Sequence, residues 1–148
     1  MYQIMIVDDE PLILAGIASL LDWEKQECVI AGKAGNGQQA LKLMEEQRPD
    51  IVITDIKMPG MDGISFMKAV KERGWDDIVF IILTNLEEFN LALSLGAVEY
   101  LVKMELTEEK LSEALKLAKE RCELTRLANE KASPGFPSKA DRIRRLIE

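Results

Sequence analysis

The chain of 148 residues contains no histidine, only two cysteines and only 5% aromatic residues. Without histidine it cannot build a Ser-His-Asp triad, a His-ligated zinc site or a phosphohistidine of its own. Cys28 and Cys122 match no metal-binding or redox spacing, so we interpret them as reduced thiols of a cytoplasmic protein. Any chemistry must therefore rest on carboxylates, hydroxyls and lysines.

Long apolar runs are also missing. No stretch approaches the roughly 20 residues that cross a bilayer, and Met1–Ile4 lacks the basic start of a signal peptide. We therefore expect no membrane association. Apolar residues still make up 47% of the chain and charged residues 30%, which favours a packed domain over disorder.

The net charge of −7 is unevenly distributed. Residues 1–128 carry 14 basic and 23 acidic side chains, a net charge of −9, whereas residues 129–148 carry five and three, a net charge of +2. An acidic body opposes non-specific DNA binding, because neutralising phosphates needs a basic face. Any contact with DNA is expected outside the first 128 residues.

Strand and helix patterns alternate five times. The predicted strands are apolar nearly throughout, as are parallel strands covered on both faces: Gln3–Val7, Cys28–Ala34, Ile51–Thr54, Ile78–Leu83 and Val98–Val102. The predicted helices are Pro11–Leu21, Gly37–Gln47, Gly63–Arg73, Leu86–Leu95 and a fifth that starts at Thr107. Repeated strand–helix units predict an α/β fold with a doubly wound parallel sheet. One permitted strand order is the flavodoxin-like 2-1-3-4-5.

The fifth helix is unusually long and is predicted to reach about Asn129. One apolar stripe recurs at steps of three and four residues and suits a core-facing side: Leu111, Ala114, Leu115, Ala118 and Cys122. A second row, Leu117, Leu124 and Ala128, recurs at steps of seven and four residues, as in a heptad pattern. Two interpretations stay open: a simple helical overhang, or a coiled-coil extension that links two copies.

The composition changes after the long helix. Residues 129–139 are predicted to form a linker, because Ala132–Ser138 is rich in proline, glycine and serine. Ala140–Glu148 has a helical pattern that is too short to form a core alone. We predict a first domain over residues 1–128 and the beginning of a further, truncated domain at residues 140–148.

Polar side chains follow four of the predicted strands. Asp8, Asp9 and Glu10 come after the first strand and Asp55 after the third; Thr84 and Lys103 follow the fourth and fifth. Ligands bind outside the carboxyl ends of the strands in open α/β sheets, so we expect one shared crevice. Clustered carboxylates repel one another unless a cation lies between them, and Mg²⁺ prefers such hard oxygen ligands. A carboxylate beside Mg²⁺ can also attack phosphorus.

Over roughly residues 1–125 the chain resembles a response-regulator receiver domain of a two-component system. The matching stretches are Ile6–Pro11, Asp50–Gly63, Ile82–Thr84 and Gly96–Lys103, in the right order and at the right spacing. The resemblance implies the CheY-like version of the flavodoxin-like fold, with strand order 2-1-3-4-5 and an extended C-terminal helix.

The resemblance also implies roles for individual residues. Asp55 would be the phosphoacceptor; Asp8, Asp9 and Asp55 would hold Mg²⁺, Asp9 more directly than Asp8, together with the backbone carbonyl of Lys57. Thr84 would hydrogen-bond the phosphoryl group and Lys103 would pair with it. Tyr100 would move inward when Thr84 is drawn to the phosphate.

Two positions depart from the family pattern, and two methionines have a structural interpretation. Met104 follows Lys103 where the family usually has proline, which leaves the geometry of that loop open. Asn85 is bulkier than the small residue often found after the switch hydroxyl. Met58 and Met61 flank the turn after Asp55, and we interpret them as packing residues.

The resemblance implies a switch rather than an enzyme. A sensor histidine kinase would phosphorylate Asp55, and the surface of the fourth helix, fifth strand and fifth helix would change, including its use as a homodimer interface. Sequence features that include Asp22–Glu24 resemble those of receiver domains joined to an AraC-type DNA-binding domain. The alternatives are a Mg²⁺-dependent phosphatase, whose family pattern Asp-x-Asp fails at Glu10, and a flavodoxin-like electron carrier, which lacks its phosphate loop here.

Overall fold

The computed structural model describes residues 1–88, 90 and 93–131, and its centre is a five-stranded parallel sheet. The strand order is β2-β1-β3-β4-β5. The strands are β1 (Tyr2–Val7), β2 (Cys28–Ala34), β3 (Ile51–Thr54), β4 (Val79–Thr84) and β5 (Glu99–Val102). The predicted order is confirmed, and each strand end lies within one residue of its predicted position.

The central strands are largely apolar because both faces of the sheet are covered there. Successive side chains of a strand point to opposite faces. In β1, Ile4 and Ile6 belong to the core on one face, whereas Met5 and Val7 belong to the core on the other. All four side chains are buried. A strand buried in this way cannot show the polar–apolar alternation of a half-exposed sheet. The edge strand β2 differs, since Val29, Ala31 and Lys33 on one of its faces are exposed.

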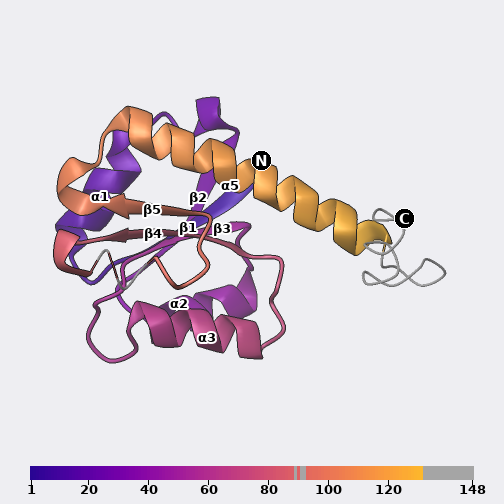
Figure 1. Ribbon diagram of the computed structural model, residues 1–148, viewed down its shortest axis with the longest axis horizontal. Helices are drawn as coiled ribbons and strands as arrows, with labels where there is room; N and C mark the ends of the chain where they lie inside the picture. Colours follow the sequence, from indigo (N-terminus) through magenta and orange to yellow (C-terminus); the bar gives the residue numbers. More distant parts are fainter. Residues whose placement is uncertain (89, 91–92, 132–148) are drawn as a thin grey trace.

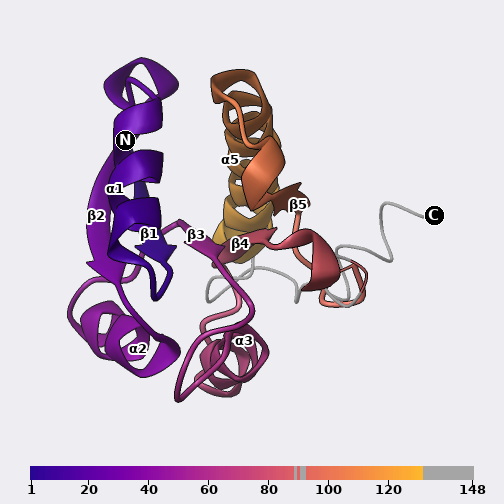
Figure 2. The ribbon, with the colours of Figure 1, turned by 90° about the vertical axis from the view of Figure 1, so that its left-hand side faces the viewer.

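Helices form a layer on each face of the sheet. Figure 2 shows α1 (Pro11–Leu20) and α5 (Glu108–Lys131) on one face, and α2 (Gly37–Glu46) and α3 (Gly63–Glu72) on the other. Helices α2 and α3 begin at side-chain caps, which satisfy otherwise unpaired N–H groups. Asn36 accepts a hydrogen bond from the N–H of Gln39, and Asp62 accepts one from the N–H of Ser65, both at 2.8 Å.

Helix α5 begins where Thr107 accepts a hydrogen bond from the N–H of Lys110 at 3.1 Å. The predicted core stripe is confirmed, since every member is 3% exposed or less: Leu111, Ala114, Leu115, Ala118 and Cys122. Leu117 and Leu124 are 42% and 64% exposed. Figure 1 shows the end of α5 running beyond the sheet. Whether this extension is an overhang or a dimer-forming coiled coil stays a prediction.

A continuous helix over Leu86–Leu95 is not confirmed. Leu86–Glu88 forms a short 3-10 helix, η2, in which the N–H of Glu88 bonds to the carbonyl of Asn85, three residues back. Residues 93–95 form a turn and bend, and residues 89, 91 and 92 lie outside the described residues. Gly96 does end this segment, with a φ of 77° that favours glycine.

The C-terminal predictions are tested only in part. Residues 129–131, predicted to start a linker, are the last residues of α5. Residues 132–148 lie outside the described residues, so the remaining linker and the further domain stay predictions. Within the described part of the chain, no helix is long and apolar enough to cross a membrane.

Candidate functional site

The predicted polar residues converge at the carboxyl edge of the sheet. Parallel pairing aligns Val7 with Thr54 and Thr84 with Val102, so β1, β3, β4 and β5 end beside one another. Lys103 Nζ lies 2.7 Å from a carboxylate oxygen of Asp8 and 2.7 Å from one of Asp55. Residues up to 95 positions apart in sequence therefore form one site.

Lys103 is the centre of this site. Its side chain is 7% exposed, and those of Asp8 and Asp55 are 2% and 4% exposed. Burial opposes the charge of the ammonium, but hydrogen bonds with Asp55 and Asp8 outweigh it and raise the pKa of Lys103. Burial also raises the pKa of Asp8, and Lys103 counteracts this effect. The ammonium compensates two carboxylates that would otherwise be buried without a partner.

Backbone hydrogen bonds orient both buried carboxylates. Asp55 Oδ1 accepts the N–H of Ile56 at 2.7 Å, and Asp8 Oδ1 accepts the N–H of Glu10 at 2.9 Å. The Oδ2 atoms face Lys103, and two 2.7 Å distances to one nitrogen place them no more than 5.4 Å apart. Each carboxylate thus keeps one oxygen anchored and directs the other into the site.

The donor set fits a hard divalent cation. Carboxylate oxygens of Asp8, Asp9 and Glu10 lie within 4.8 Å of one another, with Asp8 buried and the other two exposed. Oxygen ligands, several of them anionic, are what Mg²⁺ prefers. The Lys103 ammonium is now the positive charge between Asp8 and Asp55. Lys57 follows two residues after Asp55 and is exposed; its role as a carbonyl ligand stays a prediction.

Thr84 has a buried hydroxyl that lacks a partner among the described residues. The residue is 1% exposed and ends β4, next to the strand that leads to Asp55. Leaving such a group unsatisfied costs about 1–3 kcal/mol. A ligand oxygen that accepts this hydrogen bond would recover that cost.

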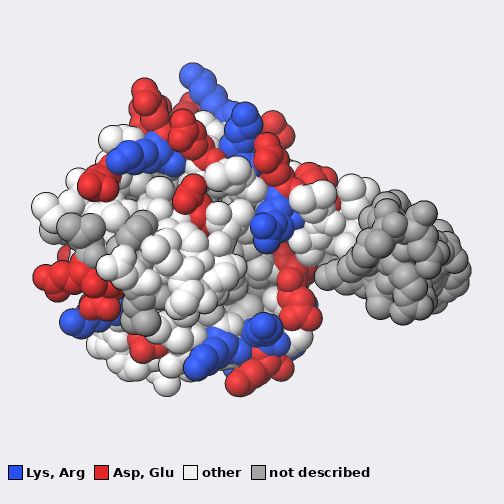
Figure 3. Space-filling view, in the orientation of Figure 1, with Lys and Arg blue, Asp and Glu red and all other residues white. Residues whose placement is uncertain are grey.

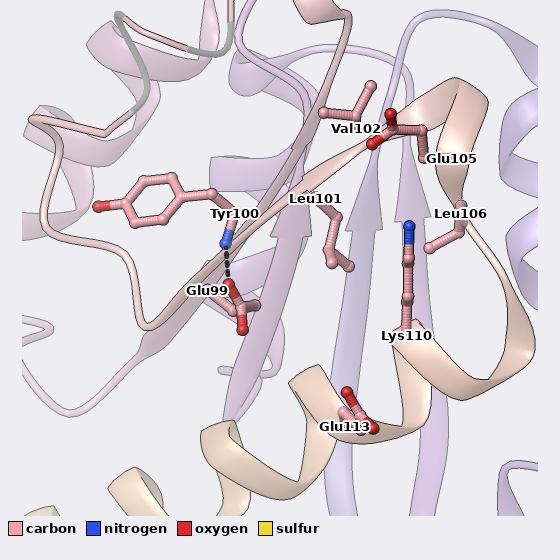
Figure 4. Close-up of a pocket in the computed structure, with 8 residues that line it drawn as sticks. All are labelled: Glu99, Tyr100, Leu101, Val102, Glu105, Leu106, Lys110 and Glu113. Atoms are coloured by element: carbon pink, nitrogen blue, oxygen red, sulfur yellow. Dashed lines mark hydrogen bonds between the residues drawn. The ribbon is translucent and has the colours of Figure 1, made fainter.

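Tyr100 is half-buried and is held by a hydrogen bond to the backbone. Its hydroxyl accepts a hydrogen bond from the N–H of Ala97 at 2.9 Å, and its ring packs near Ile82 and Leu95. Figure 4 shows the ring pointing away from a groove lined by Glu105, Lys110 and other residues of β5 and α5. The predicted inward movement of Tyr100 is not tested by this one conformation.

The turn after β3 is packed tightly against the site. The N–H of Gly63 donates to the carbonyl of Ile56 at 2.6 Å, and a Cβ at Gly63 would lie 2.2 Å from the carbonyl oxygen of Asp55. Met58 is buried and Met61 packs against the same core, so the interpretation of both as packing residues is confirmed. The sequence showed Gly63 only as a motif residue, because its close approach depends on where α3 lies.

The loop after β5 keeps Lys103 aimed inward although Met104 follows it. Lys103–Glu105 forms a 3-10 helix, η3, closed by the N–H of Leu106 on the carbonyl of Lys103. Met104 is 92% exposed. The contact between Lys103 and Glu10, at 3.4 Å, was not predicted. Its only sequence signal was that Glu10 follows Asp8 and Asp9.

The molecular surface has no continuous basic patch on the face that Figure 3 shows, among the atoms coloured there. Acidic and basic side chains are mixed around an uncharged centre. This distribution agrees with the acidic charge of residues 1–128 and does not suit phosphate-backbone binding by this face.

Comparisons with known proteins agree with this geometry. A response regulator receiver domain model matches residues 4–116. The transcriptional regulatory protein YesN of Bacillus subtilis is 41% identical over 106 residues, covering 70% of this chain and 28% of YesN. The positive alginate biosynthesis regulatory protein of Pseudomonas aeruginosa is 41% identical over 136 residues, covering 90% of this chain and 54% of the relative.

A solved structure shows the same likeness. The receiver domain of AraT, a response regulator from Geobacillus stearothermophilus, matches with a TM-score of 0.75 and 30% identity, over 84% of this chain and 98% of that one. The chain spans about half or less of the length of the two curated relatives. Because the receiver match covers the sheet, the site and the start of α5, the chain belongs to the response regulator receiver domain family.

Proposed function

We propose that the chain is a phosphorylation switch in which Asp55 accepts a phosphoryl group from a sensor histidine kinase. The observation that carries this proposal is the buried Lys103 ammonium, 2.7 Å from both Asp8 and Asp55. Asp8, Asp9, Asp55 and the carbonyl of Lys57 are the proposed Mg²⁺ ligands. The cation would supply charge neutralisation for the transferring phosphoryl group.

The orientation of Asp55 supports Oδ2 as the reacting oxygen in the proposed transfer. Oδ1 accepts a hydrogen bond from the N–H of Ile56, whereas Oδ2 accepts one from the Lys103 ammonium. In the proposed reaction, Oδ2 forms the new bond to phosphorus and the bond from phosphorus to the donor imidazole nitrogen breaks. Lys103 then pairs with the phosphoryl oxygens, and the Thr84 hydroxyl donates to one of them. The product is an acyl phosphate on Asp55.

The proposed output surface lies around β5. A groove of about 250 Å³ runs between β5 and the start of α5, and Glu99, Glu105 and Glu113 line it with a single lysine, Lys110. If Thr84 turns toward the phosphoryl group, the space beside it becomes available to Tyr100. We propose that this change alters the fourth-helix, β5 and α5 surface and its use in homodimers.

The phosphodonor is proposed to dock on α1. This helix has no charged residue, and its Leu12 is 86% exposed; Met104, which follows Lys103 in sequence, is 92% exposed. A groove of about 210 Å³, lined by Leu12, Lys103 and apolar residues of α1, opens next to the site. An exposed apolar surface of this kind marks an interaction site.

The output is proposed to be transcriptional and to act in the cytoplasm. Two curated relatives are named as regulatory proteins, and both extend well beyond the matched region. We propose an AraC-type DNA-binding domain that begins near residue 140, after the linker, so that DNA contacts lie outside residues 1–128. The +2 charge of residues 129–148 supports this assignment.

Incubation with acetyl phosphate and Mg²⁺, followed by intact mass measurement, tests the switch. One phosphoryl group should be added to the parent chain and none to Asp55→Asn. Without Mg²⁺ the addition should be far slower. Continuous turnover of phosphoesters, with no retained phosphoryl group, would instead support a phosphatase.

A further inference from the structure

The side chain of Glu10 is the third carboxylate around the Lys103 ammonium. Its Oε1 lies 3.4 Å from Nζ, and the side chain is 58% exposed, in contrast to the buried Asp8 and Asp55. An ammonium carries three N–H donors, and three carboxylates surround this one. Glu10 therefore contacts Lys103 from the solvent side of the site.

The backbone of Glu10 is held by hydrogen bonds, whereas its side chain contacts Lys103 and makes no capping bond. The N–H donates to Asp8 Oδ1 at 2.9 Å, and the carbonyl accepts from the N–H groups of Ile13 and Leu14 at 3.0 and 3.1 Å. Glu10 is the N-cap residue of α1, yet its side chain makes no capping hydrogen bond. A carboxylate is favoured at this end of a helix even without such a bond.

A cation and Lys103 would compete for the same carboxylate oxygens. The Oδ2 atoms of Asp8 and Asp55 now bind the ammonium, and a divalent cation would need oxygens of the same two side chains. Two positive charges cannot both remain in contact with both carboxylates without repelling each other. Lys103 then needs another anionic partner at the mouth of the site until a phosphoryl group arrives.

We propose that Glu10 is a positioning residue for Lys103, holding its ammonium at the mouth of the site when Asp8 and Asp55 turn to a divalent cation. This inference rests on the proposed function. The inference requires both the length and the negative charge of the Glu10 side chain, because both determine its contact with Lys103.

Three variants separate the effect of side-chain length at position 10 from the effect of its charge. Glu10→Asp keeps the charge but shortens the side chain by one methylene, and Glu10→Gln keeps the length but removes the charge. Glu24→Gln, on the short helix η1 (Glu24–Gln26) that precedes β2 at the other end of the sheet, controls for net charge. Each is made in the parent chain and in a Lys103→Ala background, giving a double-mutant cycle.

The first readout is the Mg²⁺ dissociation constant, measured by calorimetry without a phosphodonor. Glu10→Asp and Glu10→Gln should each weaken binding about two- to fivefold, the range for a partly exposed ion pair, because Lys103 then leaves the carboxylates less readily. Glu24→Gln should have no effect. In the Lys103→Ala background, Glu10→Asp should have none either.

The second readout is the rate at which acetyl phosphate phosphorylates Asp55. Glu10→Asp and Glu10→Gln should each lower this rate about two- to fivefold, and the loss should depend on Lys103 as the Mg²⁺ affinity does. Parent-like Mg²⁺ affinity in Glu10→Asp, or a Glu10→Gln effect that persists undiminished without Lys103, would overturn the inference. Absence of phosphorylation in the parent chain would refute the proposed function, while the Mg²⁺ cycle would still decide the role of Glu10.

Discussion

Arg126, near the end of α5, forms an ion pair with Asp50, the residue directly before β3. Arg126 Nη2 lies 3.0 Å from Asp50 Oδ1, and the other oxygen of Asp50 accepts the N–H of Gln3 at 2.7 Å. The guanidinium also lies 5.1 Å from the centre of the Tyr2 ring. The outgoing end of α5 is therefore attached to the edge of the sheet opposite Asp55.

Replacing Arg126 with alanine should loosen the end of α5 more than it destabilises the domain. The pair is partly exposed, so the free energy of unfolding should fall by only about 1 kcal/mol. Amide hydrogen exchange should become faster in the last two turns of α5 and stay unchanged in β3. Arg121→Ala, an exposed change on the same helix, is the control. Equal exchange in both variants would show that the Asp50 contact does not hold the helix.

Removing the buried ammonium should destabilise the domain more than removing the phosphoacceptor charge. Lys103→Met leaves two buried carboxylates without compensation, for a loss of about 3–5 kcal/mol near neutral pH. Asp55→Asn leaves Lys103 paired with Asp8, so its loss should be smaller. Urea unfolding measures both changes. Added Mg²⁺ should recover part of the loss in Lys103→Met, since it supplies the missing positive charge; a loss equal to that of Asp55→Asn would contradict this account.

Alanine at Gly63 should be harmful, whereas alanine at Gly16 should be tolerated. A Cβ at position 63 would lie 2.2 Å from the carbonyl oxygen of Asp55, so β3 or α3 must shift, at a cost of about 1–3 kcal/mol. At Gly16, within α1, a Cβ meets nothing within 4 Å, and alanine should stabilise the helix by about 0.5–1 kcal/mol. Thermal unfolding tests the pair. If both variants changed the unfolding temperature in the same direction, the structure around Gly63 would have room for a Cβ.

The sheet was predictable because its signals are local. Continuous apolar runs such as Ile51–Thr54 indicated two covered faces, and the edge at which parallel strands end followed from their direction. The contact of Lys103 with Glu10 and the approach of Gly63 to Asp55 were not predictable, since each depends on tertiary positions within an ångström. The helix expected over Leu86–Leu95 stays only partly tested: its first residues form a 3-10 turn closed by the hydrogen bond from the N–H of Glu88 to the carbonyl of Asn85, which apolar spacing does not report, and residues 89, 91 and 92 lie outside the described residues.

Tyr2 should lose its phenolic proton at an unusually high pH. Its hydroxyl donates a hydrogen bond to the Glu123 carboxylate, which raises the pKa of Tyr2 to about 12. The protonated phenol is favoured in the fold, so this stabilisation is complete below the ordinary pKa of about 10 and is lost as the pH rises through about 12. Tyrosinate absorbance in Tyr100→Phe, where Tyr2 is the sole tyrosine, should show this. Adding Glu123→Ala should return the pKa toward about 10; an ordinary value before that change would disprove the hydrogen bond.

A charged residue in place of Leu12 or Met104 should slow phosphorylation by a protein donor but not phosphorylation by a small-molecule donor. Both side chains are almost fully exposed beside the site, and neither contributes a group that reacts with phosphorus. Leu12→Glu or Met104→Glu should slow phosphoryl transfer from a histidine kinase at least tenfold, because a carboxylate would be desolvated in an apolar interface. Phosphorylation by acetyl phosphate, which needs no docking surface, should stay within twofold of the parent rate. Leu124→Glu, on the exposed side of α5 far along that helix, should alter neither rate. If both donors slow equally, the substitutions disturb the site itself, and the α1 face is not where the donor protein binds.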